Sequence, residues 1–181
     1  MDTTETTYRR NGELRETMMN WYQTDFKDHT LLTSHFPRRF NGQRFDEYDA
    51  IKYHRNFLKT LNRKIYGKDG RFYRGKPPRR QFPVMPIFEL HPWNGRHSHI
   101  LMDRPSEFSR PEFTMLLKKT WIQTRLTSDY ESPRETLMKD PHVTYDNITI
   151  DQKTGYVTKF DQKPFHEYDL YFDFTNLYIP D

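Results

Sequence analysis

Cysteine is absent from the 181 residues of this chain, which excludes disulfides and thiolate metal ligands. No apolar run approaches the length of a membrane span or a signal peptide, so we expect a cytoplasmic protein with no membrane partner. A GxxxxGK[ST] phosphate loop is also missing, because the nearest candidate, Gly75-Lys76, runs into Pro77. ATP-driven work would therefore have to come from another chain.

Hydrophobic residues are scarce, at 34% of the chain, whereas aromatic residues reach 16%, with 14 Phe and 12 Tyr. A core built largely from aromatic rings is the expected result, and this richness in rings excludes disorder throughout the chain. The length fits one domain that is large enough for a hydrophobic core.

Positive charge is concentrated in one part of the chain, although the net charge is only +4. The segment 63–80, which we call the basic segment, has Asp69 as its single acid and several aromatic residues between its cations. These cations are Arg63, Lys64, Lys68, Arg71, Arg74, Lys76, Arg79 and Arg80. The composition suits a nucleic acid, whose phosphates attract cations and whose bases stack on rings. The alternative is a solvated loop whose charges keep the protein soluble.

Residues 1–28 are expected to form an N-terminal extension that is partly helical, with a short apolar stripe at Leu14, Met18, Trp21 and Tyr22. The acidic, aromatic residues 161–181 are expected to pack on the domain as a C-terminal tail. Between them, hydrophobic periodicity predicts strands over 30–36, 82–91, 97–103 and 142–150, and helices over 46–66 and 109–125. A short helix or turn is expected at 154–160.

Two local signals support these boundaries. Asn94-Gly95 is a strong hairpin turn between the second and third strands, and Ser109 with Glu112 forms a capping box at the start of the second helix. The order β-α-β-β-α-β predicts an α+β fold of the ferredoxin-like, or RRM-like, kind: an antiparallel sheet with both helices on one face. In this topology the first and third strands are central.

His97 and His99 lie two residues apart on the third strand, so their imidazoles are expected on the same face, opposite to Ser98. If the apolar side chains of this strand point to the helices, the histidines point to the open face of the sheet, where a substrate could reach them. The alternative is a pair of hydrogen-bonded histidines on an exposed sheet.

A third ligand is needed to hold a divalent ion. Glu89, on the neighbouring strand, is the first candidate, because a carboxylate between Phe88 and Leu90 is costly unless it is paired or bound to a metal. His91, two residues on, is the second candidate. Imidazole and carboxylate ligands together suit Mn²⁺ and tolerate Mg²⁺.

Tyr156 and Lys159 are one helical turn apart, so a phenol and a cation would share one surface. A phenol becomes a nucleophile when a cation and a metal-bound phosphate lie close to it. The alternative is a tyrosine that only fills the core. Together with the histidine pair, the tyrosine and lysine suggest phosphodiester chemistry.

In these features the chain resembles the HUH endonucleases, and among them the rolling-circle replication initiators, or Rep proteins, of the single-tyrosine type. Residues 31–36 resemble the first motif of the family, His97-Ser98-His99 resembles the metal motif, and Tyr156-Val157-Thr158-Lys159 resembles the third motif, Tyr-x-x-Lys. The resemblance implies that residues 29–160 form the endonuclease domain, with a ferredoxin-like core.

The resemblance also implies the activity. The protein would nick single-stranded DNA at the replication origin of a phage, plasmid or mobile element, join the 5′ phosphate to Tyr156, and leave a 3′ hydroxyl for a polymerase. The metal ligands would be His97, His99 and Glu89, and Lys159 would assist near the metal or the scissile phosphate. A helicase and a polymerase would be supplied in trans by a bacterial or archaeal host. DNA would be held by the basic segment and Arg96, and whether a DNA hairpin is also recognised is left open.

The sequence departs from the family in two respects. Ser98 stands between the histidines where the family usually has a bulky hydrophobic residue, and we expect no helicase domain of the kind common in eukaryotic viral relatives. The alternatives are a single-tyrosine transposase-like strand transferase, a non-catalytic module that binds single-stranded nucleic acid, and a degenerate homologue with a structural role. An RNA-recognition module would carry aromatic residues on its third strand, where this chain has its two histidines.

Overall fold

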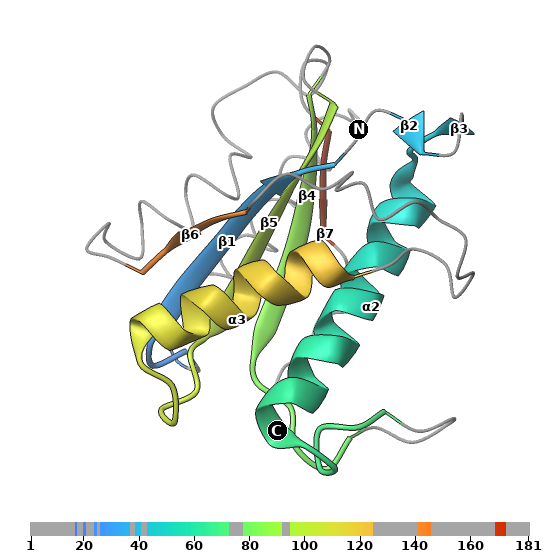
Figure 1. Cartoon of the computed structure of the whole chain (residues 1–181). Coiled ribbons are helices and arrows are strands. Elements are labelled where there is room, and N and C mark those ends of the chain that lie inside the picture. Colours follow the sequence, from blue (N-terminus) through green and yellow to red (C-terminus); the bar gives the residue numbers. More distant parts are fainter. Residues whose placement is uncertain are drawn as a thin grey trace.

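The fold is an antiparallel sheet with two helices packed on one face (Figure 1), which confirms the predicted α+β class. The computed structural model describes residues 17, 20, 24, 26–36, 39–40, 43–72, 78–91, 95–124, 141–145 and 169–172. The strand order in the main sheet is β6-β1-β5-β4-β7. Its strands are β1 (His29–His35), β4 (Val84–His91), β5 (Gly95–Asp103), β6 (His142–Thr144) and β7 (Asp169–Phe172). A second sheet pairs β2 (Arg39–Phe40) with β3 (Gln43–Arg44).

The order of the four strands β6, β1, β5 and β4 is compatible with a ferredoxin-like arrangement, because β1 and β5 are neighbours in the middle of the sheet. All strand pairs in the main sheet are antiparallel. Strand β7 was not predicted; it comes from the acidic C-terminal residues and pairs with β4 at the edge of the sheet. Several predicted features lie outside the described residues: the stripe from Leu14 to Tyr22, the turn at Asn94, and the segments 146–150 and 154–160.

Capping residues determine where both helices begin. Helix α2 (Glu47–Tyr66) begins after Asp46, which forms a reciprocal capping box with Asp49 and satisfies backbone N–H groups of the first turn. Helix α3 (Arg110–Gln123) begins after Ser109, and the predicted capping box with Glu112 is confirmed. Hydrogen bonds from the side chain and backbone of Ser109 lower the pKa of the Glu112 carboxyl.

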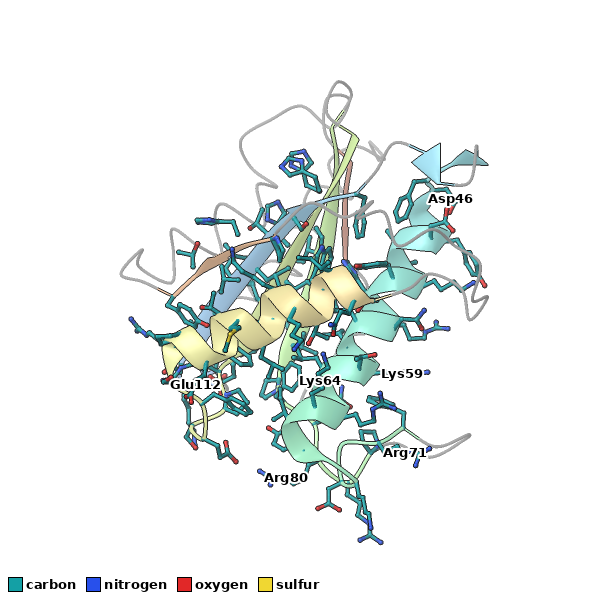
Figure 2. All side chains as sticks on the ribbon, viewed as in Figure 1. Asp46, Lys59, Lys64, Arg71, Arg80 and Glu112 are labelled. Atoms are coloured by element: carbon teal, nitrogen blue, oxygen red, sulfur yellow. The ribbon has the colours of Figure 1, made fainter. Side chains whose placement is uncertain are left out.

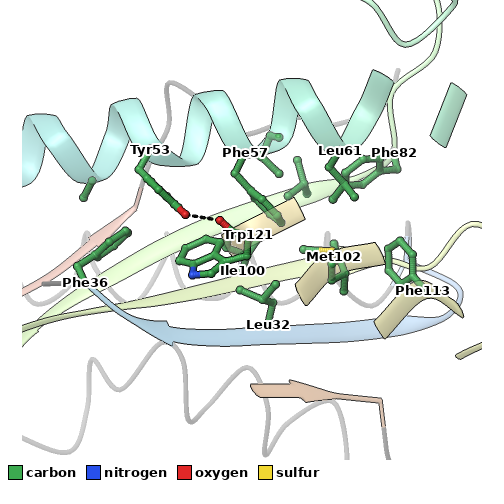
Figure 3. Packing of buried hydrophobic residues seen from close by; sticks show 14 of the residues in the cluster. Leu32, Phe36, Tyr53, Phe57, Leu61, Phe82, Ile100, Met102, Phe113 and Trp121 are labelled. Atoms are coloured by element: carbon green, nitrogen blue, oxygen red, sulfur yellow. Dashed lines mark hydrogen bonds between the residues drawn. The ribbon is translucent and has the colours of Figure 1, made fainter. Parts of the chain in front are cut away.

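Aromatic rings make up about half of the buried residues in the core between the helices and the sheet (Figure 3), in line with the richness in rings of the composition. Trp121 of α3 is fully buried against Tyr53 and Phe57 of α2, with ring centroids 4.8 and 5.1 Å away. The Tyr53 hydroxyl donates a hydrogen bond to the Trp121 carbonyl, which ties the two helices together. Burial raises the pKa of the Tyr53 phenol far above its usual value. From the sheet, Leu32, Ile100 and Met102 complete this core.

The opposite face of the sheet is buried as well. Leu31, Met85, Ile87 and Leu101 lie on this second face, and each is at most 7% exposed. The expectation of an open face beside the helix-covered one is therefore wrong for this part of the sheet. The reason for this burial is the run Ile100-Leu101-Met102, since a strand without alternation of apolar and polar residues is buried on both sides.

Within the described part of the chain, neither helix has a stretch long and apolar enough to cross a membrane.

Candidate functional site

The two histidines of β5 lie on the face of the sheet that is turned away from the helices. Ser98, between them, points the other way and contacts His54 of α2. His99 is only 2% exposed, and His97 is half-buried. The pair therefore shares one face, as alternation along a strand requires, but the prediction that both imidazoles lie on an open surface is wrong for His99.

Strand β1 fixes the orientation of His99. Thr33 lies directly opposite His99 in the β1–β5 register, and its Oγ1 is 3.2 Å from Nδ1 of the imidazole. A histidine that binds a metal through one ring nitrogen usually forms a hydrogen bond through the other. This contact engages Nδ1 and orients the ring, so any metal binding by His99 would have to use Nε2.

A third histidine contacts the pair from β1. His35 lies opposite His97, and the two imidazole centroids are 4.0 Å apart with an interplanar angle of 63°. His142 of β6 lies opposite Thr33 on the same face, with an exposed side chain. Directly opposite residues of antiparallel strands project to the same side, so His35 and His142 belong to the same face of the sheet as His97 and His99.

The predicted carboxylate ligand comes from the strand on the other side of β5. Glu89 of β4 lies directly opposite His97 in the register, whereas His91 lies opposite Gly95, two pairs further toward the end of the strands. This register favours Glu89 over His91 as the neighbour of the pair. The side chains of both residues lie outside the described part of the structure. Among the side chains that are described, no three His, Asp or Glu residues form a group that could hold a metal ion.

The residue types of the predicted ligand set are those that suit a divalent ion. Two imidazoles share one face, one of them has its second nitrogen engaged by Thr33, and the backbone of Glu89 lies across from the other. Such a set of two nitrogen ligands and one carboxylate would accept Mn²⁺ or Mg²⁺. Tyr156 and Lys159, the predicted nucleophile and its companion, lie outside the described residues.

The predicted nucleic-acid residues divide between a helix end and the segment that follows it (Figure 2). Arg63 and Lys64 occupy the last turn of α2, and their side chains are exposed. Lys68, Arg71, Arg79 and Arg80 are exposed beyond the helix. Arg74, Lys76 and the side chain of Arg96 lie outside the described part of the structure.

Burial and neighbouring cations both act on Lys64 at the end of α2. Partial burial, followed by the neighbouring Lys119 and Arg63, lowers the pKa of the Lys64 ammonium. Lys64 Nζ donates hydrogen bonds to Thr120 and Gln123 of α3, the helix that also carries Lys119. Like charges in proximity repel each other, and an anion bound there would relieve the repulsion.

Asn62 holds the two ends of the basic segment together. Its Nδ2 donates hydrogen bonds to the carbonyl groups of Gly70 (2.9 Å) and Arg80 (2.8 Å). A Cβ at Gly70 would lie 2.2 Å from the Asn62 carbonyl oxygen, so only glycine fits this close approach. Arg80 forms an ion pair with Glu107 at 3.4 Å, and its guanidinium lies 4.3 Å from the centroid of the Tyr66 ring. The base of the segment is therefore fixed by contacts within the protein.

Sequence reasoning did not single out Thr33, His35, His54, His142 or Lys119. A signal existed for the first two, because Leu31, Thr33 and His35 alternate along a strand and must share a face. Their position beside His97 and His99 depends on the register between β1 and β5, for which the sequence contains no local signal.

No protein-family model matches the chain, and neither a curated protein nor a solved structure matches it. The candidate site is therefore described by the geometry of its own residues.

Proposed function

We propose that the chain is a metal-dependent, single-stranded DNA endonuclease and strand transferase of the HUH type, with a ferredoxin-like core and the metal site on the face away from the helices. It would initiate rolling-circle replication of a phage, plasmid or mobile element. The observation that carries this proposal is the pairing of His97 and His99 on one face, with Thr33 engaging one ring nitrogen of His99 and with Glu89 opposite His97 in the register.

In the proposed reaction, the Tyr156 phenol loses its proton, and its oxygen attacks the scissile phosphorus. A bond forms between phosphorus and the tyrosine oxygen, the bond from phosphorus to the 3′ oxygen breaks, and the 3′ oxygen leaves as a hydroxyl after taking up a proton. Lys159 would stabilise the negative charge that develops on the phosphate. A divalent ion held by His97, His99 and Glu89 would supply additional polarisation of the phosphate.

The surface of α2 supports the substrate class. The cations at the end of this helix and in the rest of the basic segment would bind phosphates of a single strand, and another part of the same strand would enter the site. Such a strand would reach the site along the end of the sheet where His35 and His97 are half-buried.

Covalent trapping tests the activity. The full chain is incubated with a library of single-stranded DNA and Mn²⁺, separated under denaturing conditions, and the DNA ends joined to protein are sequenced. Wild type and Tyr48→Phe, which alters an exposed tyrosine of α2, should form an adduct, and Tyr156→Phe should form none. An adduct formed by Tyr156→Phe at the wild-type rate would refute the assignment.

A non-catalytic module that binds single strands is the second candidate, and the basic surface of α2 favours it equally. Thermal unfolding with increasing Mn²⁺ separates the two functions, because only a metal site raises the melting temperature in a manner that depends on both His97 and His99. Equal responses of wild type and His97→Ala/His99→Ala would favour the binding module.

A further inference from the structure

A polar pair lies beneath the two histidines, beside a core cluster of hydrophobic residues. His54 Nε2 of α2 and Ser98 Oγ of β5 share a hydrogen bond of 2.7 Å, and both residues are 0% exposed. The His54 ring contacts Phe36 and Trp121, with centroids 5.6 and 6.4 Å away. Burying two polar groups is unfavourable unless they are paired, so this hydrogen bond selects one arrangement of helix and strand.

The location of Ser98 gives the hydrogen bond its significance. Ser98 is the one residue between His97 and His99, and its side chain points to the helices while theirs point away. A small residue leaves space between β5 and α2, and the His54 ring occupies this space. Because Ser98 and the two histidines share consecutive peptide units, fixing the Ser98 side chain also fixes the backbone from which both imidazoles extend.

We propose that His54 is a positioning residue for the histidine pair. Through its hydrogen bond to Ser98 it fixes the position of the β5 backbone relative to α2, and this position directs both imidazoles to a common point. The proposal rests on the proposed metal site for its function, but the positioning itself can be measured without a metal. His54 lies on the opposite face of the sheet from the imidazoles and touches neither substrate nor ion in this role.

Three variants separate positioning from stability. His54→Leu/Ser98→Ala removes both polar groups together, which avoids leaving one of them buried without a hydrogen bond. His54→Gln keeps an amide nitrogen near the position of Nε2 and should retain the contact to Ser98. Tyr53→Phe is the matched control, because it removes a buried hydrogen bond from the neighbouring residue of the same helix, directed to α3 and not to β5.

Mn²⁺ affinity, measured by electron paramagnetic resonance on the folded proteins, is the first measurement. Loss of a residue that orients a metal ligand usually weakens metal binding about 10- to 100-fold, and we expect a loss of this size in the double variant only. His54→Gln and Tyr53→Phe should stay within about threefold of wild type. A double variant that binds Mn²⁺ as tightly as wild type, or an equal loss in Tyr53→Phe, would overturn the proposal.

The second measurement uses no metal. Imidazole ¹H–¹⁵N correlation spectra of the wild-type protein should show one set of signals each for His97 and His99, and the double variant should show broadened or duplicated signals. Unchanged spectra would overturn the positioning role. Wild-type protein that does not bind Mn²⁺ would contradict the proposed function alone, since the spectra would still decide whether His54 orders the pair.

Discussion

Tyr53→Phe should be less stable than wild type at neutral pH and nearly equal to it in stability at alkaline pH. At pH 8 the substitution removes a hydrogen bond to the Trp121 carbonyl, which still accepts one from the backbone N–H of Thr124. Because the carbonyl keeps this partner, we expect a loss of only about 1 kcal/mol, the usual net value of a buried hydrogen bond.

Burial raises the pKa of Tyr53 in the folded protein, whereas the phenol of the unfolded chain ionises near its usual value of about 10. The contribution of neutral Tyr53 is therefore complete below the pKa of the unfolded chain. It decreases as the pH rises through the interval up to the folded pKa, by about 1.4 kcal/mol per pH unit. At pH 11 wild type should have lost about 1.4 kcal/mol that Tyr53→Phe cannot lose, so the two proteins should be nearly equal in stability.

Urea unfolding followed by tryptophan fluorescence, at pH 8 and pH 11, measures the difference directly. Tyr48→Phe is the matched control, since Tyr48 lies on the same helix with 70% of its surface exposed. Other groups titrate at alkaline pH in all three proteins, and their effects cancel when the variants are compared. A gap of about 1 kcal/mol between wild type and Tyr53→Phe that persists at pH 11 would refute the reasoning.

Three further outcomes are expected. Thr33→Val should weaken Mn²⁺ binding about tenfold, because it frees Nδ1 of His99, whereas Thr33→Ser should bind normally; equal titration curves for both would contradict the role of the hydroxyl. The affinity for single-stranded DNA falls as salt rises, and Arg63→Ala/Lys64→Ala should make the slope of log affinity against log salt less steep by about 1.4, if each cation contacts one phosphate. An unchanged slope would show that these two cations do not contact the DNA. Asp46→Ala should cost about 1 kcal/mol in urea unfolding, and Asp46→Asn much less, since the side chain caps α2; identical losses would argue against the cap.

Much of the fold was predictable because local rules determine it. Apolar spacing and capping residues located both helices to within a few residues, and the order of elements predicted that β1 and β5 would be neighbours. Strand β7 was missed because its four residues, Asp169–Phe172, acquire their strand character by pairing with β4. A segment this short contains too little periodicity to predict such a partner.

The candidate site was predictable only in part. Alternation along one strand is a local property, so the shared face of His97 and His99 followed from spacing alone. The contacts of Thr33 and His35 with that pair depend on the register between strands more than 60 residues apart, as the pairing of Thr33 with His99 shows. The burial of His99 depends on the unbroken apolar run Ile100-Leu101-Met102 that follows it, because a strand with such a run is buried on both faces.

The pairing of β7 with β4 has a practical consequence for any shortened version of this protein. Leu170 lies opposite Glu89 in this pairing, so the last strand protects the backbone of the strand that contributes the candidate carboxylate. Deleting the residues after 160 would leave β4 as a bare sheet edge, and such edges recruit strands from other molecules. Shortened versions without β7 should therefore self-associate through β4, the strand that carries Glu89.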